Sequence, residues 1–337
     1  GYTRFPGVPL QPLEHLSNDF AESWTANIRI FSYIVPDMRK VKVFFVVAAA
    51  VLSLSAWSKD YHVSPRGKSL EKALKSISME KSDVRLILSG GDYFISGPVI
   101  FKDLKGVTIE AAPGQEPVLR GDRIIKGFKP WKDGILRASL KSLGIKDMGE
   151  ACVKADLVDL YWKGERQRIA AYPDEGFLIS GEALGQTVVD DVTKKEGIFK
   201  YKEEVIDSWA DEKDAWIYGY FRWDWKDDYG KVASIDPQAR TISIAEPWHY
   251  YGYKDGFKFK GVNILKGLDS PGEYYIDREA GVLYWYPPVD YAPGDEVTIS
   301  VFSSEFMLEV SGCEGVAVQG LTFIGGRTNA VSVEGSR

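Results

Sequence analysis

Two dense groups of aromatic residues point most directly to chemistry. They lie in residues 209–229 and 248–253 and comprise Trp209, Trp216, Tyr218, Tyr220, Phe221, Trp223, Trp225, Tyr229, Trp248, Tyr250, Tyr251 and Tyr253. An aromatic face can cover the apolar C–H surface of a sugar while neighbouring polar groups bond its hydroxyls. The same rings could instead form the core of a β-sandwich, and both interpretations stay open at this point.

Three aspartates accompany the first aromatic group: Asp224, Asp227 and Asp228. A pair of carboxylates at a defined separation hydrolyses glycosidic bonds, one as the acid and the other as nucleophile or base. The alternative is a solvated turn over residues 226–230. A calcium loop is a third interpretation, but the residues lack the full EF-hand pattern.

A histidine in the second aromatic group, His249, could bond a sugar hydroxyl or carry a proton, or it could be structural. The candidate substrate-binding residues are therefore Trp223, Asp224, Trp225, Asp228, Trp248, His249 and Tyr250. Glu273, Asp277 and Arg278 also resemble a catalytic set, but their strand-and-turn context predicts that they orient the turn by local bonds.

Several other chemistries lack support in the sequence. It contains only three histidines and two cysteines, with no Gly-x-Ser-x-Gly, His-Glu-x-x-His or Cys-x-x-Cys motif. We therefore expect neither a serine-hydrolase site nor a metal site. The net charge of −6 also argues against a nucleic-acid partner. Whether Cys152 and Cys313 pair is left open, although Cys313 has the surroundings of a buried packing residue.

A secretory signal pattern occupies residues 38–58. A basic start at Met38 is followed by an apolar run from Val43 and a small-residue exit ending at Ser58. The apolar run is too short to serve as a permanent membrane anchor, so export to the periplasm or the medium is expected. Residues 1–37 are then interpreted as a non-native upstream segment.

Short β-branched runs separated by glycine and proline occupy both ends of the remaining chain. They fall at 84–88, 93–95, 99–101, 107–109 and 118–119, and again at 297–301, 306–310, 316–318, 321–323 and 331–333. Residues 105–110 echo residues 314–319, and Leu308 and Val331 are 23 residues apart, a spacing typical of solenoid repeats. A helix over residues 69–77, with Ser69 as its N-cap, is expected to cap the first coil.

Longer alternating strands with polar turns fill the middle of the chain, at 157–162, 216–225, 241–244, 272–277 and 282–286. We therefore predict an all-β protein: first β-helix coils with a capping helix over 59–123, an inserted antiparallel β-sandwich over 124–293, and a resumed β-helix over 294–337. Because the coil pattern is unfinished at Arg337, the β-helix is expected to be incomplete at its C-terminus.

At this level of detail the chain resembles the N-terminal part of secreted bacterial right-handed parallel β-helix proteins of the glycoside-hydrolase type, the family 141 group and its relatives. The matching stretches are residues 61–67, LILSGGDY at 86–93, 106–109 with 117–121, LYWKGERQR at 160–168 with 171–173, SPGEYYIDR at 270–278 and GVLYWYP at 281–287. The resemblance implies an enzyme acting on plant or microbial polysaccharide. It places the catalytic carboxylates on coils beyond Arg337, so no catalytic residue is assigned here.

Three functions remain in view. The first is the front portion of a glycoside hydrolase, inactive by itself and binding a polysaccharide or oligosaccharide. The second is a polysaccharide lyase on the same scaffold, the one case in which a cofactor, Ca²⁺, is expected. The third is a non-catalytic glycan-binding or adhesive surface protein. The fold alone does not decide among these chemistries. The oligomeric state is also left open.

Overall fold

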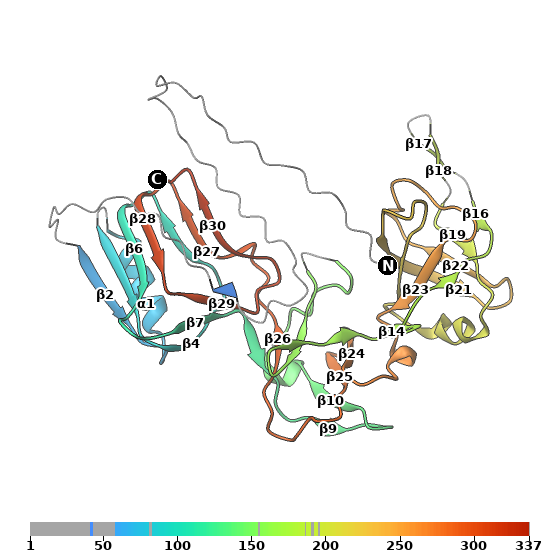
Figure 1. The fold of residues 1–337 in the computed structure, drawn as a ribbon, viewed down its shortest axis with the longest axis horizontal. Helices are drawn as coiled ribbons and strands as arrows, with labels where there is room; N and C mark the ends of the chain where they lie inside the picture. Colours follow the sequence, from blue (N-terminus) through green and yellow to red (C-terminus); the bar gives the residue numbers. More distant parts are fainter. Residues whose placement is uncertain are drawn as a thin grey trace, which may run out of the picture.

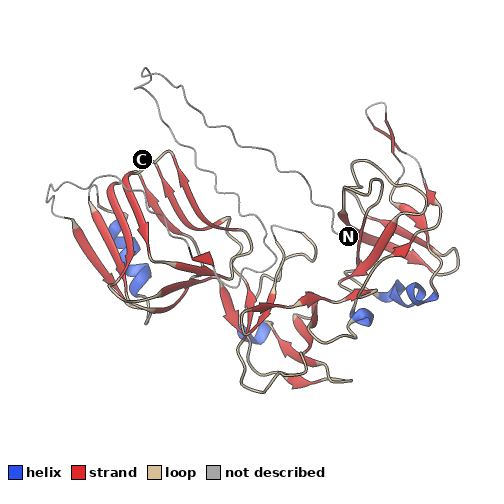
Figure 2. Ribbon diagram, viewed as in Figure 1, coloured by secondary structure: helices blue, strands red, loops and turns tan. Residues whose placement is uncertain are grey.

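The computed structural model describes residues 41–42, 58–80, 83–153, 156–185, 187–189, 192–194 and 196–336. The upstream segment 1–37 lies outside these residues, as does nearly all of the expected signal peptide 38–58. The protein is all-β, with several sheets and only short helices (Figure 2). Within the described residues, no helix is long and apolar enough to cross a membrane.

Parallel pairing joins the two ends of the chain. One sheet has the order β2–β3–β6–β28, formed by Lys59–Val63, Val84–Leu88, Lys105–Ala111 and Glu314–Gln319. A second contains β4 (Gly91–Phe94), β7 (Pro117–Arg120) and β29 (Thr322–Ile324), with β1 (Val41–Lys42) antiparallel at its edge. A third has the order β30–β27–β5, formed by Asn329–Glu334, Phe306–Ser311 and Val99–Lys102. In Figure 1 the red C-terminal strands lie beside the blue and green N-terminal ones.

The repeats seen in the sequence are register partners in these sheets. Residues 105–110 and 314–319, which echo each other, pair in parallel, with Val107 opposite Val316 and Ile109 opposite Val318. Leu308 and Val331, 23 residues apart, also lie directly opposite each other. A side chain of the same kind thus returns to the same sheet position, so the apolar residues form one continuous core.

Helix α1 (Ser69–Ile77) packs against that core through Leu70, Ala73 and Ile77, as its apolar periodicity predicts. The predicted cap was wrong. Lys68 occupies the N-cap position and makes no side-chain cap bond, while Ser69 is the first helical residue. The Ser69 hydroxyl instead accepts a hydrogen bond from the Ser64 backbone N–H, which ties the helix to the preceding turn.

Antiparallel sheets form the middle of the chain. Two of them enclose a core centred on Trp285 and have the orders β12–β11–β26–β8 and β13–β24–β25–β10–β9. Their strands are β8 (Asp122–Ile124), β9 (Lys129–Pro130), β10 (Leu136–Ser139), β11 (Leu160–Trp162), β12 (Glu165–Arg166), β13 (Arg168–Ile169), β24 (Glu273–Asp277), β25 (Val282–Tyr286) and β26 (Val297–Ser300). The β13–β24 pair is parallel, and the short helix η1 (Lys141–Leu143) follows β10.

A larger antiparallel sheet has its own core and lies at the far end of the molecule from the parallel sheets (Figure 1). Its strands are β14 (Ala171–Tyr172), β15 (Leu178–Ile179), β16 (Ala183–Leu184), β19 (Ile198–Lys200), β20 (Trp216–Gly219), β21 (Asp228–Asp236), β22 (Thr241–Ile244) and β23 (Lys258–Val262). The helices η2 (Glu204–Asp211) and η3 (Leu265–Gly267) and the hairpin β17–β18 (Thr187–Val189, Val192–Lys194) complete the region. The middle of the chain thus has two main antiparallel cores, where one sandwich was predicted.

One predicted strand belongs to a different sheet. Residues 297–301 were expected in the resumed coils, but β26 pairs antiparallel with β8 and β11. Alternating apolar residues fit either kind of sheet, so the pattern could not distinguish them. In the middle of the chain, antiparallel pairing therefore begins at Asp122 and ends at Ser300.

Candidate functional site

The aromatic residues that follow β20 are positioned by a loop. Continued alternation over 216–225 was predicted, but the strand ends at Gly219. A Cβ at Gly219 would lie only 2.5 Å from the Lys258 carbonyl oxygen of the neighbouring strand. The chain then bends and buries Phe221 against His249, Tyr253 and Phe257. Phe221 is thus buried, and residues 223–225, which follow it, are exposed to solvent.

The loop between β20 and β21 exposes two tryptophans, Trp223 and Trp225, and the Trp225 side chain is 68% exposed. The loop between β22 and β23 exposes Tyr250, at 69%, and Tyr251. The Trp225 and Tyr251 rings meet edge to face at 5.7 Å, and the Tyr250 and Tyr251 rings do so at 5.0 Å. We call Trp225, Tyr250 and Tyr251 the aromatic surface.

The two interpretations of the aromatic groups each hold for some residues. Trp209, Trp216, Phe221 and Tyr253 are buried, as expected of a sandwich core. Trp223, Trp225, Tyr229, Tyr250 and Tyr251 are exposed, as expected of a binding surface. Trp248 is half-buried and donates a hydrogen bond from Nε1 to the Ile244 carbonyl at 3.0 Å, so it supports the loop from beneath.

An imidazole and a carboxylate lie beside the aromatic surface. His249 Nδ1 is 3.1 Å from the Gly252 carbonyl oxygen, and Nε2 is 3.8 Å from Asp228 Oδ2. Because a carbonyl can only accept, Nδ1 donates to Gly252 when it carries a proton, and Nε2 is attracted to the Asp228 carboxylate when the imidazole is protonated. The His249 ring also packs 5.8 Å from Tyr251. This arrangement can hold or transfer a proton next to a sugar stacked on the rings.

The other aspartates of the region already have partners. Asp224 forms an ion pair with Lys254 at 3.2 Å, and Asp227 accepts a hydrogen bond from the Tyr218 hydroxyl at 2.9 Å. The predicted solvated turn over residues 226–230 is largely strand, because β21 begins at Asp228 and pairs with β20. The contacts therefore favour Asp228, of the three, as the acidic partner of the surface. Sequence reasoning did not select Tyr251 and Lys254, although Tyr251 belonged to the aromatic group.

The carboxylates at the β24–β25 hairpin act locally, as predicted. Glu273 accepts a hydrogen bond from the Ser270 backbone N–H at 3.3 Å, and Asp277 accepts one from the Ala280 backbone N–H at 2.8 Å. Arg278 pairs with Asp214 at 2.9 Å and also binds the Gly149 carbonyl. These contacts order the turn and join it to neighbouring segments.

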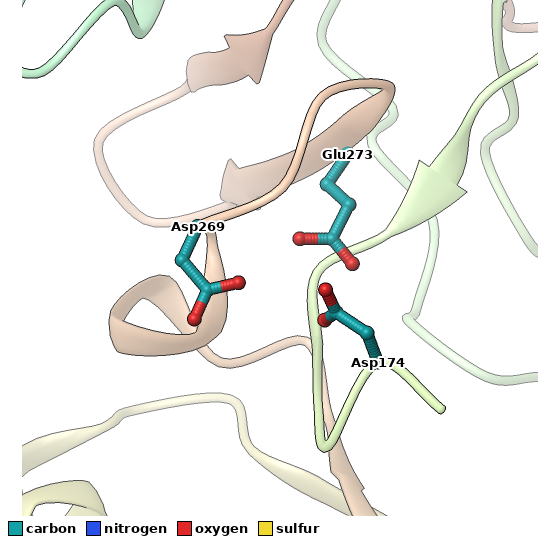
Figure 3. A group of neighbouring side chains, drawn as sticks. All are labelled: Asp174, Asp269 and Glu273. Atoms are coloured by element: carbon teal, nitrogen blue, oxygen red, sulfur yellow. The ribbon is translucent and has the colours of Figure 1, made fainter. Parts of the chain in front are cut away.

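Glu273 also belongs to a cluster that no sequence spacing indicated. One carboxylate oxygen of Glu273 and one each of Asp174 and Asp269 lie within 4.8 Å of one another (Figure 3). Glu273 is 1% exposed, and burial together with the nearby Asp174 charge raises its pKa to about 7. Such oxygens are the donors that hard cations take, but a buried carboxyl can equally keep its proton. Asp269 and Glu273 lie four residues apart in one segment, but Asp174 comes from a distant segment, so the sequence could not reveal the cluster.

The two cysteines are both free thiols. Cys313 is fully buried in the core of the parallel sheets, which confirms its predicted packing role. Cys152 is largely buried elsewhere, beside Trp216 and Val262. The structure thus contains no disulfide between them.

Comparison with known proteins gives a match in fold. No protein-family model matches the chain, and no curated protein matches it in sequence. A solved structure described as a glycoside hydrolase matches with a TM-score of 0.58 and 16% identity, covering 80% of this chain and 51% of that one. A complex of XylC with xylose matches with a TM-score of 0.33 and 16% identity, covering 80% of this chain and 36% of that one. The chain spans about half the length of the first, and at this identity the likeness shows that the chain has a glycoside hydrolase-like fold.

Proposed function

We propose that the chain is the front portion of a secreted glycoside hydrolase that acts on plant or microbial polysaccharide. In this proposal the three parallel sheets are coils of a right-handed β-helix, over 59–121 and 301–336, and the antiparallel region 122–300 is an insertion. The regular return of each chain turn to the same three sheets supports the coil assignment. The signal pattern at 38–58 supports secretion.

The observation that carries the proposal is the exposed aromatic surface beside Asp228 and His249. Large rings left in water lose the stabilisation that burial would provide, so an exposed group of them marks a binding surface. Sugars fit this surface because one ring face is apolar and the hydroxyls need polar partners. Asp228 and His249 supply those partners next to the rings.

Catalysis is assigned in this proposal to coils beyond Arg337, and the aromatic surface serves to hold the chain of sugars. Asp224 and Asp227 are committed to Lys254 and Tyr218, so neither is an available partner for Asp228 in an acid–nucleophile pair. An assay of the longer protein that includes those coils distinguishes a hydrolase from a lyase. A hydrolase releases reducing ends alone, while a lyase also makes products that absorb in the ultraviolet. We expect reducing ends without that absorbance.

Truncating the aromatic surface should weaken glycan binding. In Trp225→Ala and in Tyr251→Ala the sugar loses one stacking face, and we expect affinity to fall at least about tenfold, or about 1.4 kcal/mol. Isothermal titration calorimetry with the polysaccharide that binds the wild type measures this change. The side chains are exposed, so the midpoint of thermal unfolding should stay almost unchanged.

The matched control is Phe94→Ala, which removes an exposed ring from β4 in the parallel sheets. Its affinity should equal that of the wild type. Equal affinities for Trp225→Ala, Tyr251→Ala and the wild type would show that the aromatic surface does not bind the glycan.

A further inference from the structure

The rings of the aromatic surface do not share one plane. The Trp225 and Tyr251 ring planes meet at 68°, and the Tyr250 and Tyr251 ring planes meet at 83°. Their centroids are only 5.7 and 5.0 Å apart, so each pair packs edge to face. Tyr251 is therefore steeply inclined to both of its neighbours, and the three rings form corners where a flat platform would need parallel faces.

A tight turn explains the angle between the two tyrosines. The Gly252 N–H donates to the His249 carbonyl at 2.8 Å, which closes a β-turn with Tyr250 and Tyr251 at its two central positions. Adjacent side chains at the tip of a turn leave the backbone in different directions. The turn thus keeps the two rings in different orientations.

A second turn presents Trp225 in the same way. The Lys226 N–H donates to the Trp223 carbonyl at 3.1 Å, and Trp225 is at a central position of this turn. The Lys254 N–H donates to the Phe221 carbonyl at 2.9 Å, which joins the loop of Trp225 to the loop of the tyrosines. Because hydrogen bonds fix both turns and join the loops, the angled arrangement is pre-organised, and a ligand that fits it binds at a small cost in loop ordering.

Polar groups of both signs lie beside the rings. Asp224 precedes Trp225 in the same turn and pairs with Lys254 at 3.2 Å, and the Asp224 side chain is 70% exposed. A carboxylate accepts hydrogen bonds and an ammonium group donates them, so this pair can bond sugar hydroxyls in either role. Hydroxyls of a sugar stacked on Trp225 therefore have polar partners within the same two loops.

A crystalline polysaccharide and a dissolved chain offer different surfaces to these rings. The face of a crystal is one plane, and an aromatic ring stacks on it only when the ring face is parallel to that plane. Tyr251 cannot share a plane with Trp225 or with Tyr250, so a flat face leaves at least one of the three rings without a stacked sugar. A single chain rotates about its glycosidic bonds and can present successive sugars at different angles.

We propose that the aromatic surface binds a single dissolved glycan chain, with successive sugars stacked on differently oriented rings, and does not hold the flat face of a crystalline polysaccharide. The inference rests on the proposed function for the carbohydrate nature of the ligand and adds its physical form. A free chain gains stacking on Tyr251 as well as on a neighbouring ring, and this second contact favours it over the crystal face.

The test presents each of four sugars in two physical states. A soluble hexasaccharide is titrated in a calorimeter, and the crystalline solid of the same sugar is used to deplete the protein from solution; the four pairs are those of cellulose, chitin, xylan and mannan. At least one hexasaccharide should bind the wild type, and it should bind Tyr251→Ala at least about tenfold more weakly. The matching solid should remove no more of the wild type than of the double variant Trp225→Ala/Tyr251→Ala.

Two control variants separate the ring from other effects of substitution. Tyr251→Phe keeps the ring and should bind the hexasaccharide like the wild type, because stacking needs the ring face and not the hydroxyl. Phe94→Ala removes an exposed ring from β4 in the parallel sheets and should change neither measurement.

Three results would overturn the inference: greater depletion of the wild type than of the double variant by a crystalline solid, equal hexasaccharide affinities for Tyr251→Ala and the wild type, or binding of no hexasaccharide. If a carbohydrate still binds in these cases and Trp225→Ala weakens that binding, the proposed function stands and only the inference about the form of the ligand fails. Absence of binding to every carbohydrate, dissolved or solid, would remove both.

Discussion

The double variant Asp147→Asn/Asp156→Asn should lower the free energy of unfolding by about 3–5 kcal/mol. Both carboxylates hold Arg327, whose side chain is 0% exposed, with its Nη1 3.0 Å from Asp147 Oδ1 and 3.1 Å from Asp156 Oδ1. Nη2 also donates to the Asp147 carbonyl at 2.8 Å. Removing the two charges leaves a buried guanidinium without a counter-charge, and this is the costly state. Urea unfolding followed by circular dichroism measures the loss.

The opposite truncation serves as the control for this prediction. Arg327→Met removes the buried charge, and the two aspartates are partly exposed and can be hydrated, so its loss should be smaller. The triple variant with all three changes should recover part of the stability of the double variant. The electrostatic explanation fails if the double variant unfolds within about 0.5 kcal/mol of the wild type, the range of an ordinary surface change.

Glu273→Gln should stabilise the protein above neutral pH, by about 2–3 kcal/mol at pH 8, and leave it unchanged at pH 4. Burial and then Asp174 raise the Glu273 pKa from 4.5 to about 7. The pKa of this carboxyl is higher in the folded protein than in the unfolded chain. The stability that protonated Glu273 provides is therefore complete below pH 4.5 and is lost as the pH rises through 7. Glutamine mimics the protonated form and can still accept the Ser270 N–H. Unfolding in EDTA at both pH values tests this.

Two neighbouring variants sharpen the same experiment. Asp174→Asn removes the like charge that contributes most to the raised Glu273 pKa, so the pH-dependent stability difference between the protein with Glu273 and its Glu273→Gln variant should shrink in this background. Asp269→Asn should have a weaker effect, because the Asp269 charge contributes less than that of Asp174 to the Glu273 shift. A wild type more stable than Glu273→Gln at pH 8 would contradict this account of the cluster.

The parallel sheets could be predicted from local patterns because segments alike in sequence pair side by side in one sheet. Residues 105–110 and 314–319 are alike in sequence and are neighbours in one sheet, although about two hundred residues separate them. Helix α1 followed from its apolar periodicity alone. The number of antiparallel cores in the middle could not be obtained in this way, since alternation specifies a buried face without specifying its partner.

The candidate site was predictable in its composition and not in its geometry. The aromatic groups indicated Trp225 and Tyr250, but only the contacts around Phe221 show where β20 ends and which rings reach solvent. The pairing of Asp228 with His249 depends on two loops from different parts of the sheet.

The most direct test of the central claim, that this protein binds carbohydrate, is affinity electrophoresis of the wild-type chain. Native gels containing soluble glucan, xylan, mannan, galactan or polygalacturonate are compared with a gel without polysaccharide. We expect slower migration in at least one of these polysaccharides and loss of that effect in Trp225→Ala. Unchanged migration in every gel would contradict the account.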